Sequence, residues 1–234
     1  MRLQRFIAQS GYCSRRQAEE LIRQGAVTVN GIAITAMGSM VDPDTDRVRI
    51  AGKEIRSEAK KYFIFYKPVG LVSSHRSQGE SQTIFAYLQD KGLDTRGLTY
   101  IGRLDKDSEG LMLLTNDGNL VQELSHPSRN VEKVYEVLLS GLFRKDSIRK
   151  AREGVTVEGV RYSCSRIYIL ETKHGCTLVR CLLASGKKRH LRILFRELGF
   201  PVRSLKRTAL GGYTLGSLQP GDYKAVKLQI TKRK

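Results

Sequence analysis

The pair Asn30-Gly31, which lies between two alternating apolar segments, constrains the local fold of this chain more than any other feature. Residues 27–34 read Val-Thr-Val-Asn-Gly-Ile-Ala-Ile. An Asn-Gly pair in this setting favours a two-residue hairpin turn, because both turn positions need a positive φ. The sequence therefore predicts a hairpin over 27–34. The turn-forming residues 42–44 and the alternation at 48–50 predict a closing strand.

Two short helices are expected before this hairpin, within residues 1–24. The first carries an apolar stripe at helical spacing, formed by Leu3, Phe6 and Ile7. Ser14 and Gln17 have the S-x-x-Q spacing of a capping box, which predicts the start of the second helix. Gly25 follows the last apolar position of that helix, where a left-handed glycine commonly ends the helix.

Basic side chains gather near the predicted helix starts of this module, at Arg2, Arg5, Arg15 and Arg16. Backbone N–H groups at a helix start also attract phosphates, so RNA contact is one interpretation and ordinary surface arginines the other. The order S-R-R-x-A-x-x-x-I-x-x-G-x-V-x-V-N-G over residues 14–31 resembles an S4 RNA-binding domain, and the resemblance covers about residues 1–50. It implies RNA binding and says nothing about chemistry.

The net charge favours a polyanionic partner. The 234 residues carry a formal net charge of +18, whereas a net charge of magnitude about 2–8 is enough to keep a small domain soluble. Residues 186–234 hold 13 basic and 2 acidic side chains, net +11. Nucleic acid is the favoured partner. Anionic lipid is the weaker alternative, because no basic amphipathic helix with large apolar anchors is visible.

Several classes of protein are excluded by pattern. Apolar runs such as 63–66 and 111–114 are far shorter than the about 20 residues that a spanning helix needs, so we expect no membrane span. The N-terminus lacks the apolar segment of a secretory signal. Four cysteines without a C-x-x-C pair favour reduced thiols in a cytoplasmic protein. The spacing of His174, Cys176 and Cys181 matches no common zinc site, so we expect no metal.

The most informative stretch is residues 101–118, IGRLDKDSEGLMLLTNDG, in which 111–114 predict a buried strand. Asp105 has three plain interpretations: a loop carboxylate paired with a neighbouring base, a calcium-loop ligand, or one of a pair of catalytic carboxyls. A calcium loop needs Glu at its position 12, where this chain has Asn116. The sequence alone does not show a second carboxyl at a fixed separation.

The order G-R-L-D-x-x-S-x-G-L-x-L-L-T-N-D-G in this stretch resembles the catalytic motif of pseudouridine synthases, and more narrowly of the RsuA/RluB/RluE/RluF family, which modifies ribosomal RNA. The resemblance implies that Asp105 is the catalytic aspartate and that Arg103 takes the place of the flipped nucleotide. Residues 132–135 resemble the family's K-x-Y motif and put its tyrosine at Tyr135. Residues 186–192 resemble its third motif and put the basic partner of the aspartate at Arg192, although Ile193 stands where the family often has a second basic residue.

Each of these assignments has a physical reason and a plainer alternative. Tyr135 offers a ring that can stack on uracil, or it is only a cross-strand aromatic. Arg192 can keep a neighbouring Asp105 carboxylate ionised, or it is a surface arginine of an amphipathic helix over 191–198. The basic run Lys187, Lys188 and Arg189 is expected to contact the RNA backbone, with binding that falls steeply as salt rises.

These patterns predict an α+β protein with an S4 domain at 1–58, a short polar linker that lets the domain move, and a catalytic domain at 61–234 on a mixed or antiparallel sheet. The loop carrying Asp105 should face a basic cleft. The function expected from the resemblance is conversion of specific uridines in ribosomal RNA to pseudouridine, without a cofactor. Residues 126–132 favour 23S rRNA over 16S. The alternative is a non-catalytic RNA-binding assembly factor. A cytoplasmic monomer is expected.

Overall fold

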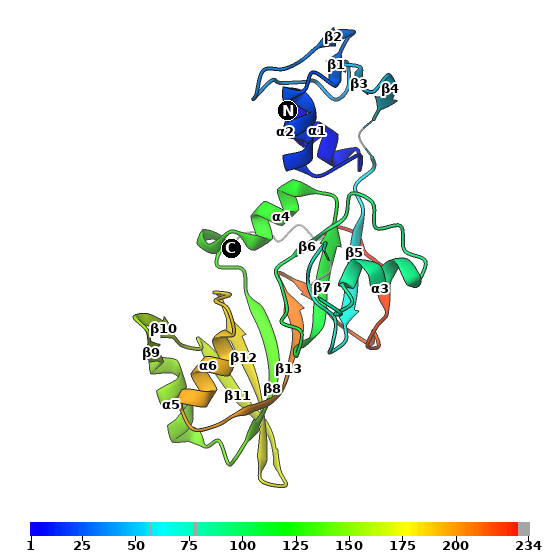
Figure 1. Ribbon diagram of the computed structural model, residues 1–234. Coiled ribbons are helices and arrows are strands. Elements are labelled where there is room, and N and C mark those ends of the chain that lie inside the picture. The colour runs from blue at the N-terminus through cyan, green and yellow to red at the C-terminus, as the bar shows by residue number, and fades with distance from the viewer. Residues whose placement is uncertain (57, 77–78, 229–234) are drawn as a thin grey trace.

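The structure is a computed structural model that describes residues 1–56, 58–76 and 79–228. Its N-terminal part, at the top of Figure 1, has two helices and a sheet with a core of their own. The helices are α1 (Leu3–Gln9) and α2 (Arg15–Arg23). The antiparallel sheet has the order β2-β1-β3-β4, with strands β1 (Val27–Val29), β2 (Ile32–Ala33), β3 (Val48–Ile50) and β4 (Lys53–Ile55). The predicted hairpin and closing strand are confirmed.

Local signals formed these elements as expected. The Ser14 hydroxyl accepts from the N–H of Gln17 at 3.3 Å, and the Ser14 N–H donates to the Gln17 side chain at 3.1 Å. The predicted capping box at the start of α2 is therefore confirmed. Gly25 follows α2 with φ +69°, a left-handed conformation that glycine adopts without steric cost. The apolar stripe of α1 is buried against the small sheet.

The larger part is built on a nine-stranded sheet, with seven strands in the order β11-β12-β8-β13-β7-β5-β15, β6 pairing with β7 and β14 pairing with β13. Its strands are β5 (Tyr62–Lys67), β6 (Thr99–Ile101), β7 (Glu109–Thr115), β8 (Lys133–Ser140), β11 (Arg166–Lys173), β12 (Cys176–Leu183), β13 (Val202–Leu210), β14 (Tyr213–Thr214) and β15 (Tyr223–Ala225). The β13–β7 pair is parallel, and the other pairs of this sheet among the described residues are antiparallel. The predicted α+β class with a mixed sheet is confirmed.

Helices cover both faces of this sheet (Figure 1). They are α3 (Ile84–Asp90), α4 (Gly118–Ser125), α5 (Lys145–Glu153) and α6 (His190–Glu197), with a 3-10 turn η1 (Pro127–Arg129) and a ribbon of β9 (Val155–Val157) and β10 (Val160–Tyr162). Alternation along β7 sends Met112 and Leu114 into a core shared with α3, α5 and α6, and Leu111 and Leu113 into one shared with α4. None of the helices described is long and apolar enough to cross a bilayer.

The start of α3 is set by a capping side chain. The helix begins at Ile84, because the Thr83 hydroxyl caps it by accepting from the N–H of Ala86 at 3.1 Å. Gln82 precedes this cap. Its side-chain amide donates from Nε2 to the carboxylate of Asp90, at the other end of the helix, at 2.8 Å.

The N-terminal part is tied to the larger part through α4 and the residues before it. Asn116 accepts from the Lys61 N–H at 2.8 Å and donates to the Ala59 carbonyl at 2.9 Å. Arg5 donates from Nη2 to the Asn119 side chain at 2.5 Å. These bonds hold the short linker and one side of α1 against the start of α4.

Candidate active site

A cavity of about 740 Å³ opens between the β6–β7 loop, strand β8, strand β13 and the segment that leads into α6. Segments far apart in the sequence meet there, because the central strands of the sheet bring them together. Seven of the predicted site residues line it: Arg103, Asp105, Tyr135, Lys187, Lys188, Arg189 and Arg192. The four N-terminal arginines are not among the residues that line it.

Asp105 lies in the loop between β6 and β7, half-buried at the cavity wall. The residue before it, Leu104, is buried in the core, and the Ser73 hydroxyl clamps it by donating to its carbonyl at 2.7 Å and accepting from its N–H at 3.2 Å. Within the described part of the chain, the Asp105 carboxylate makes no hydrogen bond or ion pair. The loop is therefore held by its neighbours while both oxygens of Asp105 stay available to a substrate.

A buried arginine of β13, to which the sequence analysis assigned no role, supports this loop from behind. Arg207 is 1% exposed and donates from Nε to the Leu111 carbonyl at 2.8 Å and from Nη1 to the Arg103 carbonyl at 3.5 Å. Its Nη2 is buried without a hydrogen-bond partner among the described residues, and the side chain lines the cavity. Arg207 thus joins the two ends of the segment that carries Asp105.

A fully buried lysine supports the other side of the same segment. Lys67, at the end of β5, donates from Nζ to the carbonyls of Ser108 at 2.7 Å and Pro68 at 3.0 Å. Burial disfavours its ammonium form and lowers its pKa to about 8, although the nearby carboxylates of Asp107 and Asp105 oppose this shift. In the sequence, Lys67 stands directly before a Pro-x-Gly turn. That pattern does not indicate that the lysine is buried.

The structure corrects the ion pair expected between Arg192 and Asp105. Arg192, in the first turn of α6, donates from Nη2 to the main-chain oxygen of Asp107 at 2.8 Å and to the Ser108 hydroxyl at 3.2 Å. Its Nε lies 3.3 Å from the Asp107 carboxylate, which also pairs with Arg189 at 3.4 Å. The turn after Asp105, closed by the Ser108 N–H bonding the Asp105 carbonyl at 3.1 Å, is what turns Asp107 toward α6.

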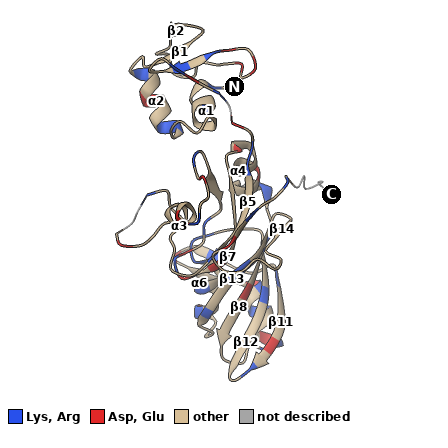
Figure 2. Cartoon of the chain, turned by 90° about the vertical axis from the view of Figure 1, so that its right-hand side faces the viewer, with Lys and Arg blue, Asp and Glu red and all other residues tan. Residues whose placement is uncertain are grey.

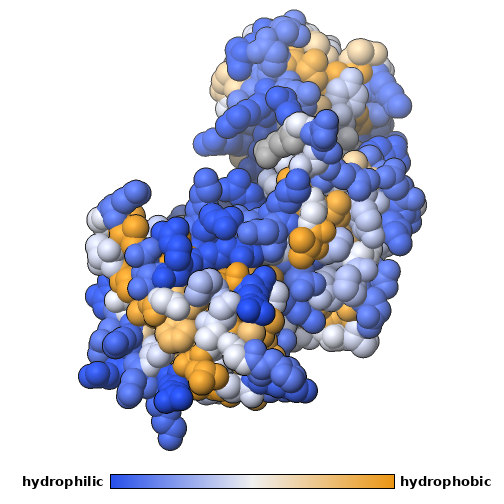
Figure 3. Space-filling model, turned by 60° about the horizontal axis from the view of Figure 1, so that its bottom comes forward, coloured by the Kyte–Doolittle hydropathy of each residue, from blue (hydrophilic) through white to orange (hydrophobic). Residues whose placement is uncertain are grey.

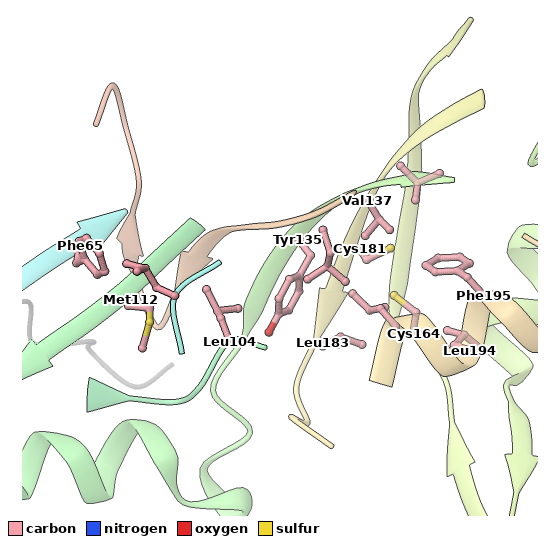
Figure 4. Close-up of a cluster of buried hydrophobic side chains, with 14 of the residues drawn as sticks. Phe65, Leu104, Met112, Tyr135, Val137, Cys164, Cys181, Leu183, Leu194 and Phe195 are labelled. Carbon is pink, nitrogen blue, oxygen red and sulfur yellow. The ribbon is translucent and has the colours of Figure 1, made fainter. Parts of the chain in front are cut away.

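Tyr135 is the cross-strand aromatic of its plainer interpretation, and its position also borders the cavity. It lies on β8 in register with Cys181 of β12 on one side and Arg207 of β13 on the other, and it is 8% exposed. Figure 4 shows its side chain between Leu104 and Leu183. It is therefore a packed cross-strand aromatic whose ring also borders the cavity, next to the residue that precedes Asp105.

The N-terminal arginines divide into two kinds. Arg5 contacts Asn119, and Arg15 lies so close to Gly118 that a Cβ there would be 2.6 Å from its Nη2. Arg2 and Arg16 are exposed, and neither forms an ion pair within the residues described. Figure 2 shows Lys and Arg positions on α2 and around α6. The sequence did not indicate that Arg5 and Arg15 contact the larger part of the chain.

Comparison with known proteins identifies both parts. Residues 61–197 match the family model described as RNA pseudouridylate synthase, and residues 1–48 match the S4 domain. A Mycobacterium bovis protein named as an uncharacterized RNA pseudouridine synthase is 36% identical over 97% of this chain and 90% of its own length. A Rickettsia bellii protein with the same description is 36% identical over 99% of each chain.

The fold agrees with these matches. A crystal structure of a pseudouridylate synthase superposes with a TM-score of 0.63 at 28% identity, covering 97% of this chain and 96% of that one. The match extends over the S4 domain as well as the large sheet. The chain belongs to the RNA pseudouridine synthase family, in the branch that carries an S4 domain at its N-terminus.

Proposed function

We propose that this RNA pseudouridine synthase modifies specific uridines of ribosomal RNA, with Asp105 as the catalytic carboxylate and 23S rRNA as the substrate. The observation that carries the assignment of Asp105 is its open carboxylate at the wall of a cavity surrounded by cationic side chains. The S4 domain spans 1–58 and the catalytic domain 61–234 in this proposal. The enzyme acts in the cytoplasm as a monomer and needs no cofactor.

The reaction is an isomerisation, so it neither gains nor loses atoms or electrons. The bond between the ribose and uracil N1 breaks, the base turns, and a bond from the ribose to ring carbon C5 forms; C5 then releases its proton and N1 takes one up, so the atoms balance. Asp105 acts as nucleophile or base in the first step, for which the anionic form is needed. Base flipping out of an RNA helix costs a few kcal/mol. Arg103, exposed two residues before Asp105, fills the space that the flipped base leaves.

The remaining residues bind the RNA or position the groups that react. Tyr135 stacks on the flipped uracil, an interaction worth roughly 1–3 kcal/mol per base. Arg192 acts on Asp105 through the turn that it holds at Asp107, rather than through a direct ion pair. Lys187, Lys188 and Arg189 meet the RNA backbone at the cavity edge, and Arg2, Arg5, Arg15 and Arg16 form the S4 contribution to RNA binding.

The choice of 23S rRNA depends on the segment that resembles large-subunit enzymes, residues 126–132. His126 of this segment lines the cavity, so its neighbours lie where they can contact RNA around the target uridine. Modification of 16S rRNA is the second candidate, and RNA binding without modification of rRNA the third.

Pseudouridine mapping by carbodiimide and primer extension tests the proposal, on 16S and 23S rRNA from cells that lack the protein. The cells receive wild type, Asp105→Asn or the control Asp44→Asn, which neutralises an exposed aspartate of the S4 part. We expect a 23S stop that wild type and the control restore and Asp105→Asn does not. A restored 16S stop overturns the substrate choice. Activity in Asp105→Asn overturns the catalytic assignment, and no protein-dependent stop overturns the rRNA assignment.

A further inference from the structure

We propose that one face of α5, formed by Lys145, Arg149 and Arg152, is a second phosphate-binding surface that holds the RNA strand as it leaves the active-site cavity. The proposal rests on the proposed function in one respect, that the target nucleotide enters the cavity at Asp105. It adds a binding site on the side of that cavity away from the S4 domain, which lies at the opposite end of the molecule from α5 (Figure 1).

The three side chains share one helix face because they are four and three residues apart. All three are exposed, and they line a hollow of about 730 Å³ between α5, residues 163–165 and residues 183–185. Ala151 of the same helix is buried in the core, which fixes the orientation of α5. Figure 3 turns this end of the molecule forward and shows hydrophilic residues interspersed with hydrophobic patches.

The cationic charge of this face is not neutralised by the protein. Within the described ranges, Lys145, Arg149 and Arg152 form no ion pair and no side-chain hydrogen bond, and Glu153 is the carboxylate that shares the hollow. Some other exposed cations are paired, as in Arg180–Glu136 at 3.0 Å and Arg196–Glu197 at 2.8 Å. Unpaired cations lining a hollow are the arrangement that binds a phosphodiester backbone through release of its counterions.

The hollow borders the active-site cavity. Leu183, Ala184 and Ser185 line both spaces, so the two lie next to each other along this segment. The chain that follows them carries the basic run 187–189. The cations of α5, the basic run and the cavity wall therefore lie around one segment of the chain, residues 183–189. A phosphate backbone fits this arrangement better than an acidic protein, whose carboxylates lack a regular spacing.

The test compares two variants that each remove two positive charges. Arg149→Gln/Arg152→Gln alters α5, whereas Lys173→Gln/Lys224→Gln alters exposed lysines that line neither space and form no ion pair with another described residue. Binding of transcribed full-length 23S rRNA is measured by filter retention over a series of KCl concentrations. A phosphate contact on a single strand contributes about 0.7 to the slope of log K against log salt, so we expect the α5 variant to lower the slope by about 1.4.

We further expect the α5 variant to keep the wild-type single-turnover rate at saturating RNA, because α5 does not touch the reacting atoms. Equal slopes in the α5 and control variants overturn the proposal, and so does a wild-type slope in the α5 variant. A reduced rate at saturation with unchanged affinity also overturns it. Repeating the binding series with 16S rRNA separates the two proposals. If the 23S assignment fails, a different RNA is modified, but the α5 variant should still lower the slope of log K against log salt.

Discussion

The guanidinium of Arg192 is bound to Asp107 twice, with Nη2 donating to its main-chain oxygen at 2.8 Å and Nε lying 3.3 Å from its carboxylate. This pair joins the start of α6 to the turn that follows Asp105. Because Arg189 also reaches the Asp107 carboxylate, two cations from the basic run and its helix converge on one side chain. Asp107 therefore links the segment proposed to contact RNA to the loop of the proposed catalytic residue.

We expect Asp107→Asn to lower the single-turnover rate about tenfold, about 1.4 kcal/mol in activation free energy, because the turn is held by fewer bonds. The substitution also releases two arginines, so RNA affinity at low salt should stay the same or increase. Stability should change by less than about 1 kcal/mol, since the pair is partly exposed. Glu136→Gln, which breaks the Arg180 pair elsewhere on the sheet, is the control. Weaker binding with an unchanged rate would contradict this role.

Lys67 makes the stability of the protein depend on pH in a defined window. Its pKa is lowered to about 8 by burial, so between pH 8 and about 10.4 the unfolded chain binds more protons than the native state. The free energy of unfolding of wild type should therefore rise with pH in this window relative to Lys67→Met, and the difference should be constant below pH 8. Urea unfolding at a series of pH values measures the free energy of unfolding of both proteins. The control is Lys173→Met, at an exposed position, and parallel curves for wild type and Lys67→Met would refute the prediction.

Gly110 allows the parallel contact between β7 and β13. Its φ is +110°, and a Cβ there would lie 2.3 Å from the carbonyl oxygen of Arg207. We expect Gly110→Ala to destabilise the protein by more than about 3 kcal/mol, because both the backbone conformation and the space exclude a methyl group. Gly159→Ala is the matched control, with φ +74° and no described atom within 4 Å of the added Cβ. It should cost about 1–2 kcal/mol in denaturant unfolding. Similar losses for both variants would argue against a steric role for Gly110.

Asn116 should control how firmly the S4 domain is held. Its side chain bonds both the Ala59 carbonyl and the Lys61 N–H, and Asn116→Ala removes both bonds. We expect trypsin to cleave after Lys60 or Lys61 several-fold faster in this variant, because cleavage requires the linker to leave its bound conformation. Gln122→Ala, an exposed change on α4, is the control. Unchanged cleavage would show that other contacts hold the linker.

The sequence by itself determined the local elements of this protein. The hairpin at Asn30-Gly31, the capping box of Ser14 and Gln17, and strand β7 follow from turn chemistry and periodicity within short windows. The resemblance carried by residues 102–118 led to the family, and the cavity contains the residues that it singled out. Signals of this kind are readable because each depends on residues within a few positions of one another.

Only the tertiary structure decided how the proposed site is supported. The parallel pairing of β13 with β7 places Arg207 behind a loop about 100 positions earlier in the chain, and the end of β5 places Lys67 beneath the same loop. The same packing directs Arg192 to Asp107 instead of Asp105. Charge and spacing in the sequence do not specify which carboxylate an arginine meets, or whether a lysine is buried. Those outcomes depend on strand order and on the desolvation that the assembled core imposes.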